Sequence, residues 1–590
     1  MSSPRPSVHA LPPSHDLPPP SQPRENSRSA GVLKTVLHHF KKHVGVGIIC
    51  AVGYFDPGNW SVDLQAGSSF GYRPMLFVIL LAGVIAIILQ VLAARLGCVT
   101  GLDLAAHCRL LLHDHPKYPR LVRRLVLYPL YVLCEIAIIS TDLAELLGSA
   151  IGLCLIFPKL PLWAGVLLTG VDVFIFLIIG DPTRGGGRPV RLFEIVIILL
   201  VAVVFICFII LLIRVSPNWP DVFLGFIPDA GLLQSDPNAV YTAIGIIGAT
   251  VMPHALFLGS FLSTQDRVTA APAPIPLPSP SPQLTYGERL RRLRRSLFTV
   301  SRSEREDLKD VRTRYGLREN NSIQFIRAHI NHGIVDVVLS LLAVAVPINS
   351  AILILAATVF YSPMSTNTGL FNMHTLIQSS LGSGAAFMFA LALVCSGQTA
   401  SVTATLAGQI VSEGFILWNI SPFLRRLLTR LISLIPSMIV AVAFGKAGIN
   451  TLLVASQVAL SVVLPFVAFP LIYLTSSKTV MSVRIPRLEK GVEAGLKSAQ
   501  LLSSLSDSPP PHVSCDHIAV VSTVVIAEEK KVEDIQDEEP LKKPSVSSSD
   551  EVIDFSSSYL LSALAYAIWV VVVIANFYAI AMLGMGETGQ

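Results

Sequence analysis

The sequence predicts an all-α polytopic membrane protein in which two helices are discontinuous. Hydrophobic residues make up 52% of the chain and charged residues only 14%, and the mean hydropathy is +0.63, whereas about a quarter of the residues in an ordinary soluble domain are charged. Apolar runs of about 20 residues recur along most of the length, and each can cross a hydrocarbon core of about 30 Å as a helix. Glycine and proline interrupt two of these runs. A lipid bilayer is therefore the surrounding we expect for this chain.

Eleven membrane-spanning helices are expected. Their approximate first residues are 43, 75, 125, 160, 192, 239, 330, 383, 428, 451 and 558. Short loops rich in Lys and Arg stay on the cytoplasmic side of a membrane. Here the segment before the first helix, with Lys34, Lys41 and Lys42, is basic, and so is every second connection after it. This alternation, with an odd number of helices, predicts a cytoplasmic N-terminus and an extracellular or lumenal C-terminus.

The composition divides the chain into six segments. They are a disordered cytoplasmic tail (1–41), the first five helices with the sixth (42–263), a Pro/Arg-rich cytoplasmic loop (264–328), helices seven to ten (329–476), a disordered cytoplasmic insert (477–556) and the eleventh helix with a short C-terminal tail (557–590). The arginines of the loop either contact anionic lipid headgroups or only set the topology. The tail and the insert are rich in Ser, Pro and charged residues, so cytoplasmic regulatory proteins are the partners expected there.

The chain lacks the motifs of several enzyme classes. Its eight cysteines form no CxxC pair, so a disulfide framework or a zinc cluster is not expected. It contains no Walker A motif, Rossmann glycine pattern or HExxH. The net charge of +5 comes from basic loops and requires no nucleic-acid partner. We therefore expect neither an enzyme nor a bound cofactor.

The hexapeptide FDPGNW, from Phe55 to Trp60, interrupts the first apolar run. Pro57 and Gly58 break a helix here, and a membrane-embedded backbone leaves the helical pattern only where protein or a water-lined cavity satisfies its N–H and C=O groups. A carboxylate at this depth is costly, so Asp56 is a candidate functional residue. The alternative is a polar kink that its neighbours satisfy.

A second interruption lies in the sixth run, in GIIGATVMPHALFLGS from Gly245 to Ser260, where Pro253 precedes a histidine. Breaks in the first and sixth helices are five helices apart, as two inverted repeats of five helices would place them. The discontinuous helices of such repeats meet at one central binding site. This is the layout of a secondary transporter, with the eleventh helix as an addition outside the core.

The two interruptions carry a mixed set of donor atoms. Asp56 offers a charged oxygen, Asn59 a neutral one, Met252 a thioether and Ala249 a free carbonyl at the break. A thioether contributes little to binding magnesium or calcium, whereas oxygen together with sulfur suits manganese, iron(II), cobalt or cadmium. The alternative for Met252 is ordinary core packing. The donor set favours a site for divalent transition metals.

Three carboxylates in the third run share one helical face. Glu135, Asp142 and Glu145 are separated by seven and three residues. Carboxylates on one stripe of a membrane helix are candidates for a proton relay. The alternative for any one of them is a structural role, with its charge satisfied by backbone groups or by Arg430.

Four segments together resemble one family. They are DPGN in the first helix, EIAIISTDLAELLGSA in the third, GATVMPH in the sixth and SGQTASVTATLAGQIVSEGF (Ser396–Phe415) in the eighth. They resemble the natural resistance-associated macrophage protein (Nramp) family of proton-coupled divalent metal transporters. The resemblance covers roughly residues 43 to 475, and the long termini and inserts look most like those of fungal and other eukaryotic members. It implies a LeuT-type 5+5 inverted repeat with discontinuous helices 1 and 6, plus an eleventh helix.

The resemblance also implies site residues. The metal ligands implied are Asp56, Asn59, Met252, the Ala249 carbonyl and, in some states, Gln457. The family usually has asparagine after the histidine of helix six, whereas Ala255 follows His254 here. We expect the ligand set to be complete and the relative affinities for different metals to differ from those of the family.

The implied proton route runs from His254 along the acidic stripe to the cytoplasm, and Arg430 is the arginine that pairs with this route. The alternative for His254 is to orient Asp56 or to gate the site. Arg425 and Arg426 are expected in a cytoplasmic loop, where topology alone accounts for them.

The function expected is secondary active transport of divalent transition metal ions (Mn²⁺ and Fe²⁺, also Cd²⁺ and Co²⁺) toward the cytosol with protons, by alternating access. Plasma membrane and endosomal or vacuolar membrane both fit. One alternative is a sodium-coupled carrier of amino acids or amines, but Asp56 would repel a substrate carboxylate at the broken helix. The other is a metal-sensing or signalling membrane protein with a transporter-like shell.

Overall fold

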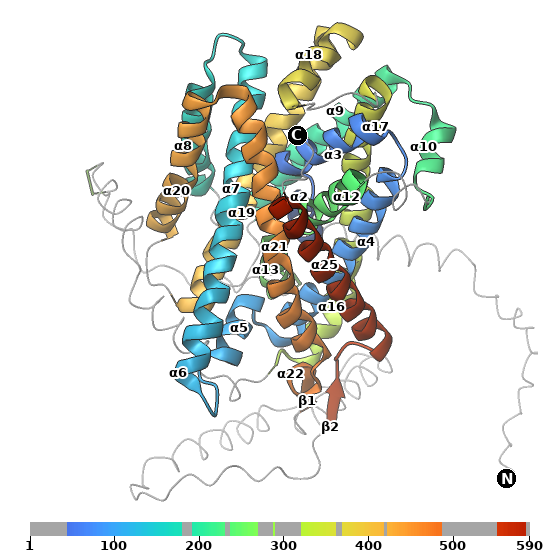
Figure 1. Cartoon of the computed structure of the whole chain (residues 1–590). Coiled ribbons are helices and arrows are strands. Elements are labelled where there is room, and N and C mark those ends of the chain that lie inside the picture. Colours follow the sequence, from blue (N-terminus) through green and yellow to red (C-terminus); the bar gives the residue numbers. More distant parts are fainter. Residues whose placement is uncertain are drawn as a thin grey trace, which may run out of the picture.

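The computed structural model describes residues 44–179, 191–229, 237–268, 287–288, 320–361, 369–417, 422–485 and 551–585. Helices run side by side along the long direction of a single bundle (Figure 1). The predicted N-terminal tail and most of the predicted loop and insert lie outside the described residues.

A helix is present at each of the eleven positions predicted from hydropathy. Two of the eleven are interrupted. The first consists of α2 (Val46–Val52) and α3 (Pro57–Phe70), and the sixth of α12 (Pro237–Thr250) and α13 (Pro253–Leu262). The others are α4 (Met75–Thr100), α7 (Tyr128–Ile156), α8 (Leu162–Ile179), α9 (Arg191–Val215), α16 (Ile323–Ser340) continued by η3 (Leu341–Ala345) and α17 (Val346–Phe360), α19 (Ser383–Ile416), α20 (Pro422–Ala443), α21 (Gly445–Ser476) and α25 (Tyr559–Met585).

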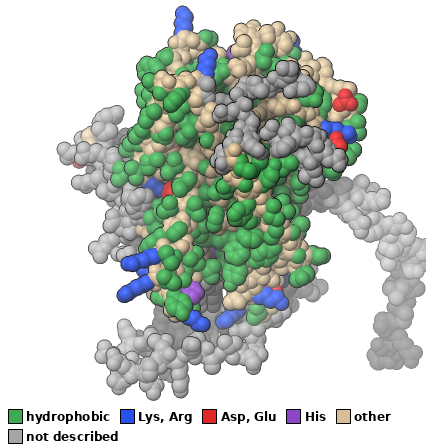
Figure 2. Space-filling view, in the orientation of Figure 1, with side chains coloured by type: hydrophobic (Ala, Val, Ile, Leu, Met, Phe, Trp, Pro, Cys, Tyr) green, Lys and Arg blue, Asp and Glu red, His purple; other side chains and the backbone are tan. Residues whose placement is uncertain are grey.

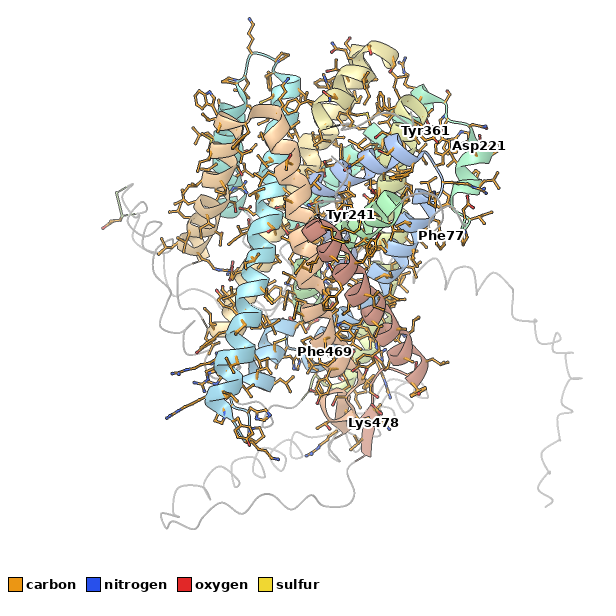
Figure 3. The ribbon with its side chains drawn as sticks, viewed as in Figure 1. Phe77, Asp221, Tyr241, Tyr361, Phe469 and Lys478 are labelled. Atoms are coloured by element: carbon orange, nitrogen blue, oxygen red, sulfur yellow. The ribbon has the colours of Figure 1, made fainter. Side chains whose placement is uncertain are left out.

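Short elements connect the long helices. They are α5 (Leu104–Leu112), α6 (Pro119–Val122), η1 (Arg123–Leu127), α10 (Trp219–Gly225), α18 (Leu370–Leu381), α22 (Lys478–Met481), β1 (Ser482–Ile485) and β2 (Glu551–Asp554). The two strands pair antiparallel, with Val483 opposite Ile553. We call the end of the bundle that carries this strand pair the ribbon end. Lys478 marks the ribbon end, and Asp221 and Tyr361 lie at the other end (Figure 3).

The flank of the bundle suits lipid. Within the described part of the chain, seven helical segments are long and apolar enough to cross a membrane. Large hydrophobic side chains such as Leu199, Ile213 and Phe577 are exposed, and hydrophobic side chains cover much of the flank in Figure 2. A surface of this kind is costly in water and favourable in a bilayer. The protein is an integral membrane protein.

The structure corrects two predicted boundaries. The insert was expected to be disordered over 477–556, but its two ends form α22, β1 and β2, whose backbone groups pair with one another. The expectation is wrong for these ends, and 486–550 lies outside the described residues. The predicted loop is also shorter at its end, because Ser322 caps α16 by accepting a hydrogen bond from the Phe325 amide at 3.3 Å.

Small residues let the central helices approach closely. A Cβ on Gly397 of α19 would overlap the hydroxyl of Ser149 on α7, and one on Gly148 of α7 would overlap the ring of Pro57 at the start of α3. Glycine at such crossings permits backbone contact between membrane helices. The broken first helix is thereby held directly against α7, the helix with the acidic stripe.

Candidate metal site and acidic pathway

The break in the first helix is shaped by its own sequence. Asp56 is the N-cap residue of α3, and its Oδ1 accepts a hydrogen bond from the Asn59 amide at 2.8 Å. Pro57 occupies the first helical position, where its missing N–H costs nothing and its φ angle suits the helix. The DPGN motif therefore starts a new helix, and the second carboxylate oxygen of Asp56 takes no part in capping it.

Neighbouring helices satisfy the backbone that the break frees. The carbonyl of Tyr54 accepts from Asn349 of α17 at 2.6 Å. The carbonyl of Phe55 accepts from Ser396 of α19 at 2.7 Å and from the Trp60 indole at 2.9 Å. The sequence analysis missed Asn349 and Ser396 as supporting residues, although polar residues within apolar runs were a signal that could have found them.

The second break follows from proline chemistry. Between α12 and α13, Met252 is extended, with φ −85° and ψ 127°, and Pro253 begins α13. In a continuous helix the carbonyl of Ala249 would accept from residue 253, but proline has no N–H. The Ala249 carbonyl is therefore without its helical donor, as the sequence analysis anticipated.

The two breaks lie against each other and against α21. A Cβ on Gly53 would lie 3.2 Å from His254 Nε2 and 3.5 Å from the Cβ of Ala255. A Cβ on Gly58 would overlap the side-chain amide of Gln457. The structure thus brings Gln457 and His254 to the first break.

Several donor atoms at this centre lack partners within the protein. Asp56, Asn59 and Met252 are at most 1% exposed. Within the described residues, Asp56 Oδ2, both amide atoms of Asn59 and Gln457 Oε1 are buried without a hydrogen-bond partner. Unsatisfied buried polar atoms are expensive, and a bound cation would satisfy the oxygens.

The candidate donors at this centre are of mixed types. Asp56 carries a carboxylate, Asn59 and Gln457 carry amides, and Met252 carries a thioether. No group of three or more His, Cys, Asp or Glu side chains that could hold a metal occurs in the part of the chain that the structure describes.

The acidic stripe of α7 continues from this centre. His254 Nδ1 lies 3.3 Å from the hydroxyl of Thr141 on α7. Glu145 is fully buried, and neither of its carboxylate oxygens has a partner in the described structure. Asp142 accepts a hydrogen bond from Arg430 of α20, whose guanidinium also donates to the Thr169 carbonyl at 3.0 Å.

Arg425 is placed differently from the sequence-based expectation. It belongs to α20 rather than to a loop, is 5% exposed, and donates to Glu135 at 2.8 Å. Topology alone therefore does not account for it. A small recess lies between the two ion pairs and is lined by Ile138, Asp142, Ala404, Thr405, Gly408, Arg425 and Thr429.

A charged cluster holds the start of α2. Asp336 of α16 accepts from the Gly47 amide at 2.7 Å, and Glu194 of α9 pairs with Arg267 at 2.6 Å and with Arg191 at 2.7 Å. The Glu194 carboxylate lies against Gly45, where a Cβ would be 2.9 Å from it. The sequence analysis missed this cluster, although Asp336 and Glu194 are carboxylates within predicted spans.

An all-α membrane bundle whose first and sixth helices break at one buried polar centre is the architecture of a secondary transporter. The chain belongs to the Nramp family, because the model for natural resistance-associated macrophage protein-like sequences matches residues 47–496. The predicted fold class, with discontinuous helices one and six, is confirmed.

Similar proteins support membership of the Nramp family. The manganese transporter pdt1 of Schizosaccharomyces pombe is 41% identical over 449 residues, which span 76% of this chain and 77% of the relative. The iron transporter SMF3 of Saccharomyces cerevisiae is 37% identical over 451 residues, 76% of this chain and 84% of the relative. A crystal structure of an Eremococcus coleocola manganese transporter variant superimposes with a TM-score of 0.59 at 26% identity, covering 95% of this chain and 97% of the other.

Proposed function

We propose that this protein carries divalent transition metal ions, foremost Mn²⁺ and Fe²⁺, toward the cytosol together with protons. The observation that carries the proposal is the buried centre between the two helix breaks, where Asp56 Oδ2 and the side-chain amide atoms of Asn59 have no hydrogen-bond partner among the described residues. Relatives described above are a manganese transporter and an iron transporter, and both functions agree with this chemistry.

The ligands proposed are the Asp56 carboxylate, the Asn59 side-chain oxygen, the Met252 thioether, the Ala249 carbonyl and the Gln457 side-chain oxygen. A carboxylate attracts any divalent cation, and a thioether adds more to the binding of Mn²⁺, Fe²⁺, Co²⁺ or Cd²⁺ than of Ca²⁺. Ala255 is fully buried against Gly53 and offers no side-chain hydrogen bond. Selectivity among these metals therefore rests on the ligands themselves.

The proton route proposed begins at His254 and Glu145 and passes the Asp142–Arg430 and Glu135–Arg425 pairs. The recess beside the pairs supports this route, because Asp142 of one pair and Arg425 of the other both line it. Arg430 and Arg425 each donate a hydrogen bond to a carboxylate of the stripe. A proton that arrives at the stripe would pass between groups on one helix.

The attachment of α2 supports alternating access as the proposed mechanism. Its start is held by Asp336 and lies against Glu194, and we place this end at the cytoplasm because the flanking loops are basic. Release of α2 from these carboxylates would open the metal centre inward. A negative-inside potential favours the entry of each positive charge by about 2.3 kcal/mol per 100 mV.

The test is manganese uptake into proteoliposomes with internal pH recorded at the same time. We expect uptake with acidification for the parent protein, loss of uptake for Asp56→Ala, and competition by calcium for Met252→Ala. Asp221→Ala is the control, since Asp221 lies at the periphery of the bundle (Figure 3) and contacts Asn218. Uptake that is absent in folded parent protein, or that survives Asp56→Ala, would overturn the proposal.

A further inference from the structure

The eleventh helix, α25, is bonded to α21 by a regular polar stripe. Ser562, Trp569 and Asn576 follow one another at intervals of seven residues and so share one face of α25. Ser562 accepts from Ser476 at 3.0 Å, Trp569 donates to the Pro465 carbonyl at 2.9 Å, and Asn576 accepts from Ser461 at 2.7 Å. The residue numbers of the partners on α21 decrease as those of the stripe on α25 increase, so the two helices are antiparallel.

The stripe lies along the part of α21 where proline removes backbone hydrogen bonds. Pro465 and Pro470 lie inside this helix, and the missing N–H of Pro465 leaves the Ser461 carbonyl without its usual donor. Phe469 lies on the same stretch (Figure 3), with its ring centroid 5.4 Å from that of Trp569 and 6.4 Å from that of Tyr566. α25 thus supports α21 where its own hydrogen bonds are fewest.

The supported stretch touches both helix breaks. A Cβ on Gly248 would overlap the side chain of Ser461, so Ser461 lies against the residue that precedes Ala249. Gln457, one turn earlier on the same face of α21, lies against Gly58 in the first turn after Asp56. A movement of this turn of α21 therefore displaces contacts at both halves of the metal centre.

Asn576 is buried, although many other side chains of α25 are exposed. It is 6% exposed, whereas its neighbour Phe577 is 72% exposed. Its amide nitrogen donates to the Val572 carbonyl at 2.9 Å, which leaves the amide oxygen directed to Ser461. A polar side chain inside a membrane bundle is costly unless it is bonded, so this residue is satisfied only while α21 stays in place.

We propose that Asn576 and Trp569 are positioning residues for metal binding, which hold the Gln457–Ser461 turn of α21 against the two helix breaks. The inference rests on the proposed function, since it assigns α25 a role at that same metal centre.

The test measures Mn²⁺ binding to the purified full-length protein by titration calorimetry. Interhelical hydrogen bonds in membranes contribute modestly, so we expect Asn576→Leu to weaken Mn²⁺ binding by about three- to tenfold. Ser562→Ala is the matched control, because it removes the bond at the other end of the stripe and should leave Mn²⁺ binding unchanged.

A double-mutant cycle separates positioning from simple helix adhesion. Ser461→Ala should weaken binding about as much as Asn576→Leu, and the double variant should be no weaker than either single one. If Asn576→Leu fails to fold, Ser461→Ala alone serves as the test. Parent-like Mn²⁺ affinity in these variants, with only a lowered melting temperature, would overturn the inference. Absence of Mn²⁺ binding in the folded parent would instead refute the proposed function.

Discussion

Arg430 of α20 donates to the Asp142 carboxylate of α7, and both residues are 5% exposed. The same guanidinium donates to the Thr169 carbonyl of α8. One arginine therefore ties three helices together beside the acidic stripe. Removing one partner of a buried ion pair leaves an uncompensated charge, which costs more than the pair contributes.

We accordingly predict that Arg430→Ala lowers the free energy of unfolding by about 3 kcal/mol or more. The double variant Arg430→Ala with Asp142→Ala should recover part of this loss, because no unpaired carboxylate remains. Denaturation of the purified protein in detergent measures both. Arg73→Ala is the control, since Arg73 and Asp229 form an exposed pair at 3.8 Å, and it should cost less than about 1 kcal/mol. Equal losses for the two arginines would contradict this prediction.

The Gly58 position gives a prediction about the metal centre. We expect Gly58→Ala to lower manganese uptake, because the added methyl group displaces the Gln457 side-chain amide from its place at the first break. A shorter side chain in Gln457→Ala should restore part of the uptake in the double variant by making room. Gly384→Ala, at a glycine with nothing within 4 Å of an added Cβ, should behave like the parent. Normal uptake by Gly58→Ala would show that this close packing is not needed.

The contact between Asp336 and Gly47 gives a prediction about gating. Asp336→Ala removes a buried, charge-assisted hydrogen bond to α2, so the equilibrium should shift about tenfold or more toward a released α2. Cys50 is fully buried on α2, and its rate of alkylation, with the other cysteines replaced, reports the released state. Asp336→Asn keeps an acceptor oxygen and should be labelled more slowly than Asp336→Ala. An alkylation rate in Asp336→Ala equal to that of the parent would refute the gating role.

The strand pair gives a prediction about the insert. Ile485 and Glu551 are register partners at the end of the β1–β2 pair, so a short Asn-Gly turn can join them in place of 486–550. We expect the shortened protein to fold and to take up manganese with the parent KM if the insert is only regulatory. Loss of uptake in the folded, shortened protein would instead favour the signalling alternative. Uptake into cells that lack their own metal transport is the measurement.

Several residues of the candidate centre were predictable because their signal is local. Asp56, Pro57 and Pro253 were found because a carboxylate or a proline inside an apolar run is unusual wherever the chain folds. The helix positions were predictable for the same reason, since hydropathy is a property of consecutive residues. Glu135, Asp142 and Glu145 are separated by seven and three residues, and this spacing was enough to place them on one face of a helix.

The pairing of residues far apart in the chain could not be predicted in this way. Arg425 was assigned to a loop because nothing adjacent in sequence indicates Glu135, which lies 290 positions away. The ends of the insert were taken as disordered because a four-residue strand carries little signal until its partner is present.

By itself, then, the sequence determined an all-α membrane protein with breaks in its first and sixth helices and a candidate set of metal ligands. Those features depend on hydropathy, proline and glycine, which act within a few residues. Only the tertiary structure decided that Asn349 and Ser396 support the first break, that Asp336 holds α2, and that Asn576 reaches Ser461. These contacts depend on how separate helices pack, and packing at this precision is a property of the assembled bundle.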